Sequence, residues 1–195
     1  MFCFGLGVWI IASSLAYWWE RAQGRFKNLF PQPASVFAVT LGHLGLGIVI
    51  LGMVGTSFWT QTTSALLDKG QETTLHDYRF TFQGIKSLDG PNYNIDRATL
   101  HVTRDNQPLA TLQPEKRWYP IAGKDTTEVA IHPAGAGDLY IALGTEKPDK
   151  PGTWLIKLYY HPLVNLLWSG VVVMVLGGLF ALYSHVTNPK AGSKP

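Results

Sequence analysis

The hydrophobic pattern of the chain contains three long windows without a charged side chain, at residues 1–19, 30–67 and 162–189. A helix that crosses a membrane needs about 20 consecutive, predominantly apolar residues, and each window is long enough to contain one. We therefore predict a membrane protein with transmembrane helices at residues 1–19, 35–57 and 162–184. No basic residue precedes the first apolar run, which favours a retained helix over a cleaved secretory signal.

The chain between the second and third windows follows a different pattern, with short alternating runs of apolar and polar residues separated by turn residues. This periodicity is typical of β-strands, and Arg-Asp-Asn-Gln at residues 104–107 suits a hairpin turn. The predicted fold class is three transmembrane α-helices plus a small all-β domain, barrel-like or sandwich-like, at residues 58–161. The expected strands are at residues 78–82, 98–103, 109–112, 128–132, 139–143 and 154–160.

The charge distribution predicts how the chain lies in the membrane. The connection at residues 20–34 carries Arg21, Arg25 and Lys27 against one acid, and the tail at residues 185–195 carries two lysines and no acid. Cytoplasmic segments carry an excess of Lys and Arg, so we expect both in the cytoplasm and the amino terminus and the β domain outside. The net charge of +3 has this origin and does not indicate a nucleic-acid partner.

Few residues suggest catalysis. The sequence has no glycine-rich phosphate loop, nucleophile elbow or paired-carboxylate motif, which argues against a self-contained hydrolase or nucleotide enzyme. The single cysteine, Cys3, cannot form an internal disulfide. His76, His101 and His132 lack the spacing of metal ligands, and we interpret them as surface or strand-packing residues. We assign no catalytic residue.

The best candidate for chemistry is His43, near the middle of the second predicted helix. A polar side chain at that depth is costly without a partner, so we expect a buried, functional residue. The glycines around it, in Leu-Gly-His-Leu-Gly-Leu-Gly at residues 41–47, leave room for a flat cofactor or a closely packed helix. Imidazole is a common axial ligand of haem iron; the alternative is a hydrogen bond across a helix interface. His185 is expected at the membrane interface, so a second membrane histidine must come from another polypeptide.

Lys116 and Arg117 belong to a dense polar and aromatic cluster at residues 114–119. Arg offers a forked pair of donors and Lys a point charge, so the two can meet a carboxylate, a haem propionate or a partner protein. The alternative is balanced charge on a solvated loop, or salt bridges at a strand end. His161 is expected at the outer membrane surface, where it can contact a headgroup or a partner.

Several blocks of residues, in an order and spacing that span nearly the whole chain, are characteristic. They are Gly42-His43-Leu44-Gly45, Gly90-Pro91-Asn92-Tyr93, Pro114-Glu115-Lys116-Arg117 with Thr127-Glu128-Val129-Ala130-Ile131, Pro162-Leu163-Val164 and Leu176-Gly177-Gly178. Together they resemble the carboxy-terminal part of the CcmF family of cytochrome c-type biogenesis proteins, which includes CycK and NrfE. These proteins are the large membrane subunit of a haem lyase.

The resemblance implies a role in attaching haem covalently to apocytochrome c on the outer side of the bacterial inner membrane. His43 matches the second of two membrane histidines that hold a structural haem b in this family, which implies that it is an axial ligand of the haem iron. The partners implied are the haem carrier CcmE, the thiol-handling subunit CcmH, apocytochrome c and membrane lipid.

The sequence also departs from the family. The tryptophan-rich haem-handling motif, two outer histidines and the first membrane histidine belong to an amino-terminal region that this sequence lacks, and Trp18-Trp19-Glu20 is not that motif. Further departures occur at His161 and Asn165. We therefore expect a fragment, an incomplete gene product or one half of a split lyase that shares its haem with a missing amino-terminal half and is inactive alone. The competing interpretation is a membrane-tethered β domain that binds a partner and no cofactor.

Overall fold

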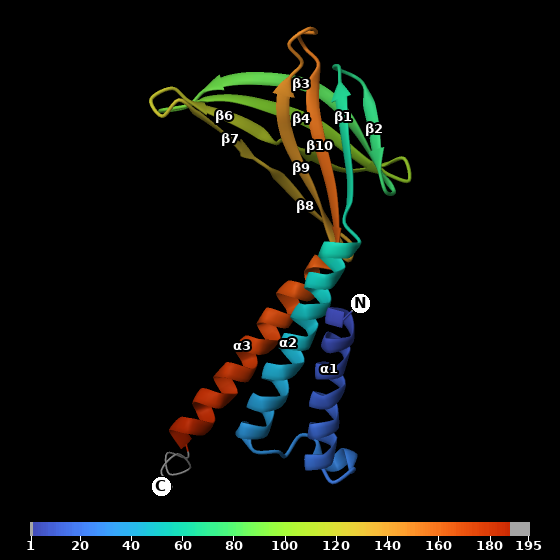
Figure 1. Ribbon diagram of the computed structural model, residues 1–195, viewed down its shortest axis with the longest axis vertical. Helices are drawn as coiled ribbons and strands as arrows, with labels where there is room; N and C mark the ends of the chain where they lie inside the picture. Colours follow the sequence, from blue (N-terminus) through green and yellow to red (C-terminus); the bar gives the residue numbers. More distant parts are fainter. Residues whose placement is uncertain (1, 188–195) are drawn as a thin grey trace. The chain divides into compact units, whose positions relative to one another are not determined.

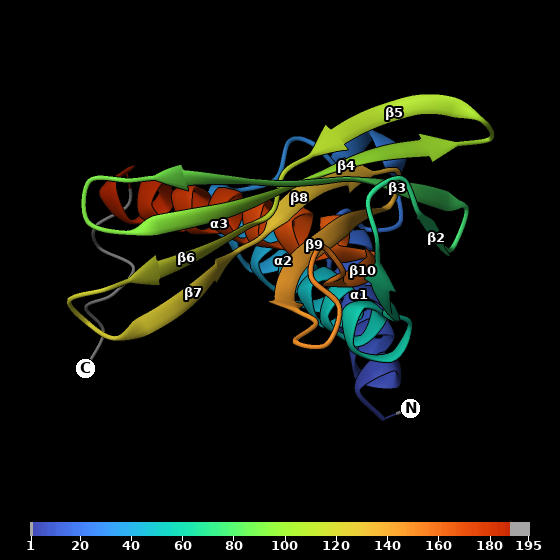
Figure 2. The ribbon, with the colours of Figure 1, turned by 90° about the horizontal axis from the view of Figure 1, so that it is seen from above.

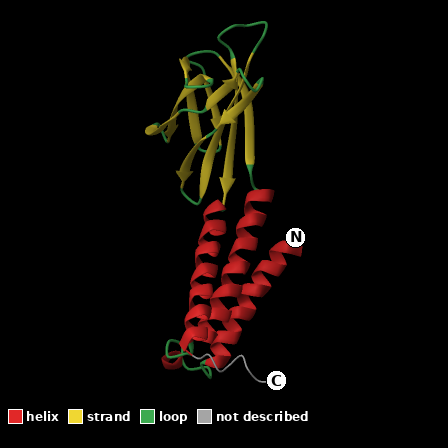
Figure 3. Ribbon diagram, turned by 90° about the vertical axis from the view of Figure 1, so that its left-hand side faces the viewer, coloured by secondary structure: helices red, strands yellow, loops and turns green. Residues whose placement is uncertain are grey.

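The computed structural model describes residues 2–187, which form two compact units. Among the described residues, one unit is helical and contains residues 2–58 and 163–187, and the other, Trp59–Pro162, is built of strands. Figure 3 distinguishes the helices, in red, from the strands, in yellow. The predicted fold class of three apolar helices plus a small all-β domain is confirmed.

Within residues 2–187, three helices are long and apolar enough to cross a membrane; Figure 1 labels them. They are α1 (Phe2–Arg21), α2 (Ala34–Phe58) and α3 (Val164–Thr187), with a short 3-10 helix, η1 (Phe26–Asn28), after α1. The last helix begins later than predicted because Pro162 still pairs with Gly137 at the end of the last strand. The side of the membrane on which each helix ends stays a prediction.

Glycines bring α2 into close contact with both neighbouring helices. A Cβ atom at Gly45 would lie 2.6 Å from the carbonyl oxygen of Gly170 in α3. On the other flank, a Cβ atom at Gly47 would lie 2.6 Å from Cγ1 of Ile11 in α1. Both distances are shorter than a carbon atom tolerates. At Gly45 the obstacle is backbone, so a larger residue requires a shift of the helices; at Gly47 it is the side chain of Ile11, with the carbonyl oxygen of Gly7 at 3.0 Å behind it. Small residues that allow such close approach are typical of packing between membrane helices.

Side chains from both ends hold the connection between α1 and α2. The indole nitrogen of Trp18 donates to the carbonyl oxygen of Leu29 at 3.0 Å, and the amide nitrogen of Gln32 donates to that of Asn28 at 2.8 Å. The ring of Trp18 also meets Phe37 of α2 edge-on, with centroids 6.1 Å apart. Trp18 therefore fixes the pairing of α1 with α2 at this end.

The β unit contains ten strands. They are β1 (Gln61–Leu67), β2 (Glu72–Leu75), β3 (Tyr78–Asp89), β4 (Asn94–Arg104), β5 (Gln107–Leu112), β6 (Glu115–Tyr119), β7 (Lys124–Glu128), β8 (Ala130–Ala134), β9 (Gly137–Glu146) and β10 (Trp154–Pro162). One sheet has the order β1-β10-β9-β8, and the other has the order β2-β3-β4-β6-β7 with β5 beside β4 (Figure 2). Every strand pair is antiparallel.

Apolar side chains from both sheets form the core of the β unit. Phe80, Phe82 and Leu100 come from one sheet and Leu139 and Ile156 from the other, and all five are fully buried. They alternate with more exposed positions along each strand, which is how two sheets bury one face each. Of the two predicted forms, the sandwich is therefore correct.

The turn predicted between two strands is confirmed. Asp105 and Asn106 connect β4 to β5 with φ angles of 51° and 58°. Two consecutive residues in the left-handed region make a type I′ turn, whose twist matches that of paired strands, and Asn and Asp tolerate this conformation best after glycine.

Candidate functional site

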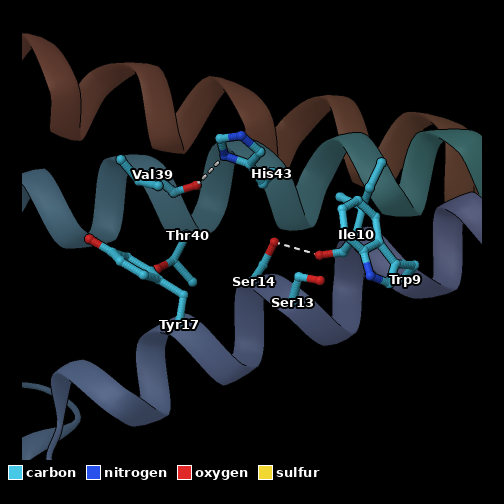
Figure 4. Close-up of a pocket in the computed structure, with 8 residues that line it drawn as sticks. All are labelled: Trp9, Ile10, Ser13, Ser14, Tyr17, Val39, Thr40 and His43. Carbon is cyan, nitrogen blue, oxygen red and sulfur yellow. Dashed lines mark hydrogen bonds between the residues drawn. The ribbon is translucent and has the colours of Figure 1, made fainter.

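His43 lies on an open face of the helical unit (Figure 4). Its side chain is exposed within this chain, together with those of Val39, Leu46 and Met53, which follow the same helical face. The prediction that His43 is buried is therefore wrong for this chain by itself. Since α1 and α3 pack on the flanks of α2, the face that carries His43 is left for lipid or for another polypeptide.

The orientation of the imidazole ring is set by its own helix. Nδ1 of His43 lies 2.9 Å from the carbonyl oxygen of Val39, one turn earlier. A carbonyl oxygen only accepts, so Nδ1 is the donor in this hydrogen bond. The neutral ring then carries its lone pair on Nε2, which is the form that ligates a metal. Metal-binding histidines typically donate their other ring nitrogen in this way. The donor set thus fits one axial position of a haem.

A shallow hollow adjoins the imidazole between α1 and α2. Its volume is about 200 Å³, below the roughly 300 Å³ of the smaller ligand pockets. Among its residues, Thr40 carries a buried hydroxyl without a hydrogen-bond partner in the described part of the chain. By itself, this hollow is therefore too small and too open to be an enclosed ligand pocket. The lining residues are Trp9, Ile10, Ser13, Ser14, Tyr17, Val39, Thr40 and His43 (Figure 4).

The glycines around His43 have different uses. As described above, neighbouring helices occupy the space beside Gly45 and Gly47. At these two positions, the predicted alternative of a closely packed helix is therefore correct. Gly42 differs, since a Cβ atom placed there would meet no atom within 4 Å. The backbone of Gly42 is nevertheless packed by α3, because a Cβ atom at Gly177 would lie 2.7 Å from the backbone nitrogen of Gly42.

Lys116 and Arg117 both lie on β6, and both face acids of this chain. Nζ of Lys116 is 2.7 Å from Oδ2 of Asp125 on β7. The guanidinium group of Arg117 donates twice to Oε2 of Glu115, at 2.8 and 2.9 Å, and its central carbon lies 5.1 Å from the ring centre of Tyr93. The structure thus contains the predicted alternative of salt bridges, formed within β6 and to β7, and the other alternative, a solvated loop, is wrong because residues 115–119 form a strand.

Glu115 is the centre of this cluster, and sequence reasoning did not single it out. It is only 8% exposed and also accepts from Nε of Arg97 at 2.7 Å. Burial disfavours the charged carboxylate, but hydrogen bonds from Arg117 and Arg97 outweigh it, so the pKa of Glu115 lies below its ordinary value. The signal missed was the pairing of β4 with β6, which brings Arg97 opposite Glu115.

The histidines of the β unit are dispersed. His76 lies beside Asp77, with Nδ1 and Oδ1 3.3 Å apart, and His101 pairs with Oγ1 of Thr111 at 2.9 Å. His132 is on β8, on another part of the sandwich. Within residues 2–187, no group of three or more His, Cys, Asp or Glu side chains is placed to hold a metal ion.

Comparison with known proteins gives one consistent family. Residues 58–162, which make up the β unit, match the family model described as the CcmF C-terminal beta-sandwich. The chain is 36% identical over 178 residues to the cytochrome c-type biogenesis protein CcmF of Escherichia coli K12, covering 91% of this chain and 27% of that protein. It is 32% identical over 188 residues to CycK of Bradyrhizobium diazoefficiens, covering 91% of this chain and 28% of that protein.

A solved structure has the same fold. The structure of the cytochrome c haem lyase CcmF superposes with a TM-score of 0.76 at 19% sequence identity, covering 93% of this chain and 30% of that one. The helical unit and the β unit thus have counterparts in one solved protein. The chain spans about a quarter of the length of the curated relatives it matches.

Proposed function

Because this chain belongs to the CcmF family, we propose that it is the carboxy-terminal portion of a cytochrome c haem lyase and takes part in the covalent attachment of haem to apocytochrome c. The relatives that support this proposal are named as cytochrome c-type biogenesis proteins. The reaction class is the addition of cysteine thiols to haem vinyl groups, in which the protein supplies binding, orientation and control of the iron.

The proposed role of His43 is to supply one axial ligand of a structural haem b. The observation that carries this proposal is the 2.9 Å hydrogen bond from Nδ1 to the carbonyl oxygen of Val39, which leaves Nε2 as the ligating nitrogen. The open face of α2 gives that nitrogen access to a ligand. Haem, when bound, supplies an iron centre whose potential depends on its axial ligands and surroundings.

The second axial ligand is proposed to come from the amino-terminal lyase half or the remainder of the same protein. Within the described residues, the only other histidine of the helical unit is His185, near the end of α3. The hollow beside His43 is also too small for a complete ligand site. Both observations favour a site shared between two parts of a lyase. CcmE, CcmH and apocytochrome c are the further partners proposed.

The proposed arrangement is multi-pass in a bacterial inner membrane, with residues 58–161 in the periplasm and residues 20–34 and 185–195 in the cytoplasm. Arg21, Arg25 and Lys27 in the connection between α1 and α2 support it. An Asp105→Cys variant in a Cys3→Ser background tests it in intact cells. A membrane-impermeant thiol reagent that reaches the new cysteine only after lysis would reverse the assigned orientation.

The haem proposal is tested by visible absorption spectra of this chain purified with a candidate amino-terminal lyase half. We expect a b-type spectrum after dithionite reduction, lost in His43→Ala and kept in the matched control His185→Ala. Loss in both variants would point to a general effect on assembly. An assembled complex without haem would instead favour the second candidate function, a β sandwich that binds a partner without a cofactor.

Lys116 and Arg117 are retained as proposed contacts for propionates or partner proteins. Each cation would have to exchange or share the acid it already faces, Asp125 or Glu115. Lys116 can exchange its acid more easily than Arg117, because Asp125 is half-exposed and forms only one ion pair with Lys116.

A further inference from the structure

Five strands of the β unit are paired on one side only. They are β1 and β8 in one sheet and β2, β5 and β7 in the other. The open side of such a strand presents unpaired backbone N–H and C=O groups, which can pair with another extended chain. Folded proteins usually block these edges with charged side chains, a proline, a bulge or a very short strand.

Four of the five edge strands carry such a device. β2 is only four residues long, and β7 carries three charged side chains among its five residues. β5 contains Pro108 and a shift of its register against β4, and β8 contains Pro133. Further pairing beside each of these four strands is therefore hindered.

β1 has none of these devices. Its seven residues, Gln-Thr-Thr-Ser-Ala-Leu-Leu, contain no charge and no proline, and they pair with β10 without a register shift (Figure 1). In an antiparallel pair, every second residue directs its backbone groups away from its partner. Among the described residues, the backbone hydrogen bonds of residues 61–67 go to β10 alone. The free edge of β1 is thus a regular row of available donors and acceptors.

The side chains beside this edge indicate what kind of segment fits it. Thr62, Ser64 and Leu66 face outward, because the residues between them pair with Leu158 and Ile156 of the core. Leu66 is 49% exposed. A strand added beside β1 would place alternate side chains next to these three residues. An apolar side chain is therefore favoured next to Leu66.

Lys157 adds a charge requirement. It is exposed on β10, opposite Ser64, and it forms no ion pair within residues 2–187. An added strand would lie two strand spacings from β10, about 10 Å, which the side chains of a lysine and a glutamate span together. The small side chain of Ser64 does not obstruct this approach. An acidic side chain next to Ser64 would therefore complement Lys157.

We propose that β1 binds an extended segment of a partner protein, which joins the four-stranded sheet as a fifth strand and places an acidic side chain next to Ser64, within reach of Lys157. In this mode of recognition, backbone pairing supplies the affinity and alternate side chains supply the specificity. The site lies within the β unit and does not depend on the haem proposal.

Two other occupants fit the edge less well. A second copy paired antiparallel about Ser64 would place Leu66 beside Thr62 and would have Lys157 on both sides of the pair, with no acid between them. A permanent contact with the rest of a lyase would be larger and more apolar. Leu66 is the only large apolar side chain that faces outward from β1. The edge therefore suits a short, reversible contact with a separate protein.

The test uses the whole chain in detergent and a synthetic peptide, acetyl-Thr-Val-Thr-Glu-Thr-Val-Thr-amide. Its sequence is the same in both directions, so it suits parallel and antiparallel pairing alike. We expect binding to slow the hydrogen exchange of backbone amides within residues 61–67, because free N–H groups of β1 become paired. The same peptide with methylated backbone nitrogens is the control, since it keeps the side chains but cannot pair, and it is expected not to bind.

A charge exchange tests the acidic requirement. Lys157→Glu is expected to weaken binding of this peptide by about threefold to thirtyfold, because an attraction between exposed charges becomes a repulsion. The same variant should bind a peptide with lysine in place of glutamate more tightly than the unmodified chain does. Lys86→Glu is the matched control, an exposed lysine on β3 in the other sheet, and should leave both affinities unchanged.

Several results would overturn the proposal. One is the absence of binding up to about 1 mM peptide, and another is binding without slower exchange in residues 61–67. An affinity that Lys157→Glu leaves unchanged would contradict the acidic requirement. Slow exchange of the same residues without peptide would assign the edge to a second copy if it occurs in a dimer of this chain. In a complex with an amino-terminal lyase half, it would assign the edge to a permanent contact.

Discussion

Gly45 of α2 and Gly170 of α3 meet backbone to backbone: a Cβ atom on Gly45 would lie 2.6 Å from the carbonyl oxygen of Gly170, and one on Gly170 would lie 2.7 Å from that of Gly45. Neither obstacle is the flexible end of a side chain. The contact is therefore closed to any larger residue unless the helices separate, and it sets the distance between α2 and α3.

Gly45→Ala is expected to destabilise the helical unit by about 1–3 kcal/mol, the usual cost of overpacking. Gly178→Ala is the matched control in α3, since a Cβ atom there meets nothing within 4 Å. An alanine in an open helical position gains roughly 0.5–1 kcal/mol over glycine. Thermal unfolding of the helical signal in detergent measures both, and equal shifts of the same sign would contradict the packing described.

Glu115→Gln is expected to destabilise the β unit by about 2–3 kcal/mol. The substitution keeps the shape but removes the charge that two guanidinium groups share in a nearly buried position. Glu72→Gln is the control, because Glu72 accepts from Oγ1 of Thr81 at 2.9 Å and faces Arg79 at 3.7 Å on the exposed surface, and exposed ion pairs contribute about 0–1 kcal/mol. Denaturant unfolding of the two variants should rank them in that order.

The same residue predicts a response to acid. The pKa of Glu115 is lowered in the folded chain, so its contribution is fully present above the ordinary pKa of about 4.3 and is lost as the pH falls through the lowered value. Stability measured from about pH 5 downward should therefore fall more steeply in the unmodified chain than in Glu115→Gln. If stability falls equally steeply in acid for both proteins, other carboxylates dominate the loss of stability at low pH.

Lys116→Gln separates the two roles considered for Lys116. Its ion pair with Asp125, at 2.7 Å, is half-exposed on the aspartate side, so stability should change by less than about 1 kcal/mol. If Lys116 also contacts a propionate or a partner, the yield of the complex with an amino-terminal lyase half, or its haem content, should fall well beyond that. Co-purification and absorbance are the measurements, with Lys86→Gln as a control on β3.

Much of the fold is predictable from local pattern, and the exceptions have physical reasons. The windows without charge predict the three helices because helices and strands of soluble domains do not need about 20 consecutive apolar residues. The strand β7, Lys-Asp-Thr-Thr-Glu, was not predicted, because it is polar on both faces and forms only by pairing with β6. The choice of a sandwich over a barrel depends on strand order, which alternation within a strand does not encode.

The candidate site was predictable in its residue but not in its surroundings. His43 stands out because an ionisable group in an apolar helix is rare. Which part of each flanking glycine meets another helix depends on how α1 and α3 cross α2. Only the structure shows that the Cβ positions of Gly45 and Gly47 are occupied, whereas Gly42 meets Gly177 of α3 through its backbone nitrogen. Lys116 and Arg117 could not be assigned because their acids are cross-strand neighbours or, for Glu115, two residues away on the same strand.

The double contact of α2 also fixes its rotational phase. Gly45 packs against the backbone of Gly170 in α3, and Gly47 packs against the side chain of Ile11 and the carbonyl oxygen of Gly7 in α1, so a rotation of α2 about its axis would create clashes on both sides. Each residue of an α-helix is offset by roughly 100° from the next, so the imidazole at position 43 has one azimuth, and the same side chain at position 42 or 44 would face elsewhere. The glycine contacts thus fix the direction in which His43 projects from α2, so a binding partner always meets the histidine in the same orientation.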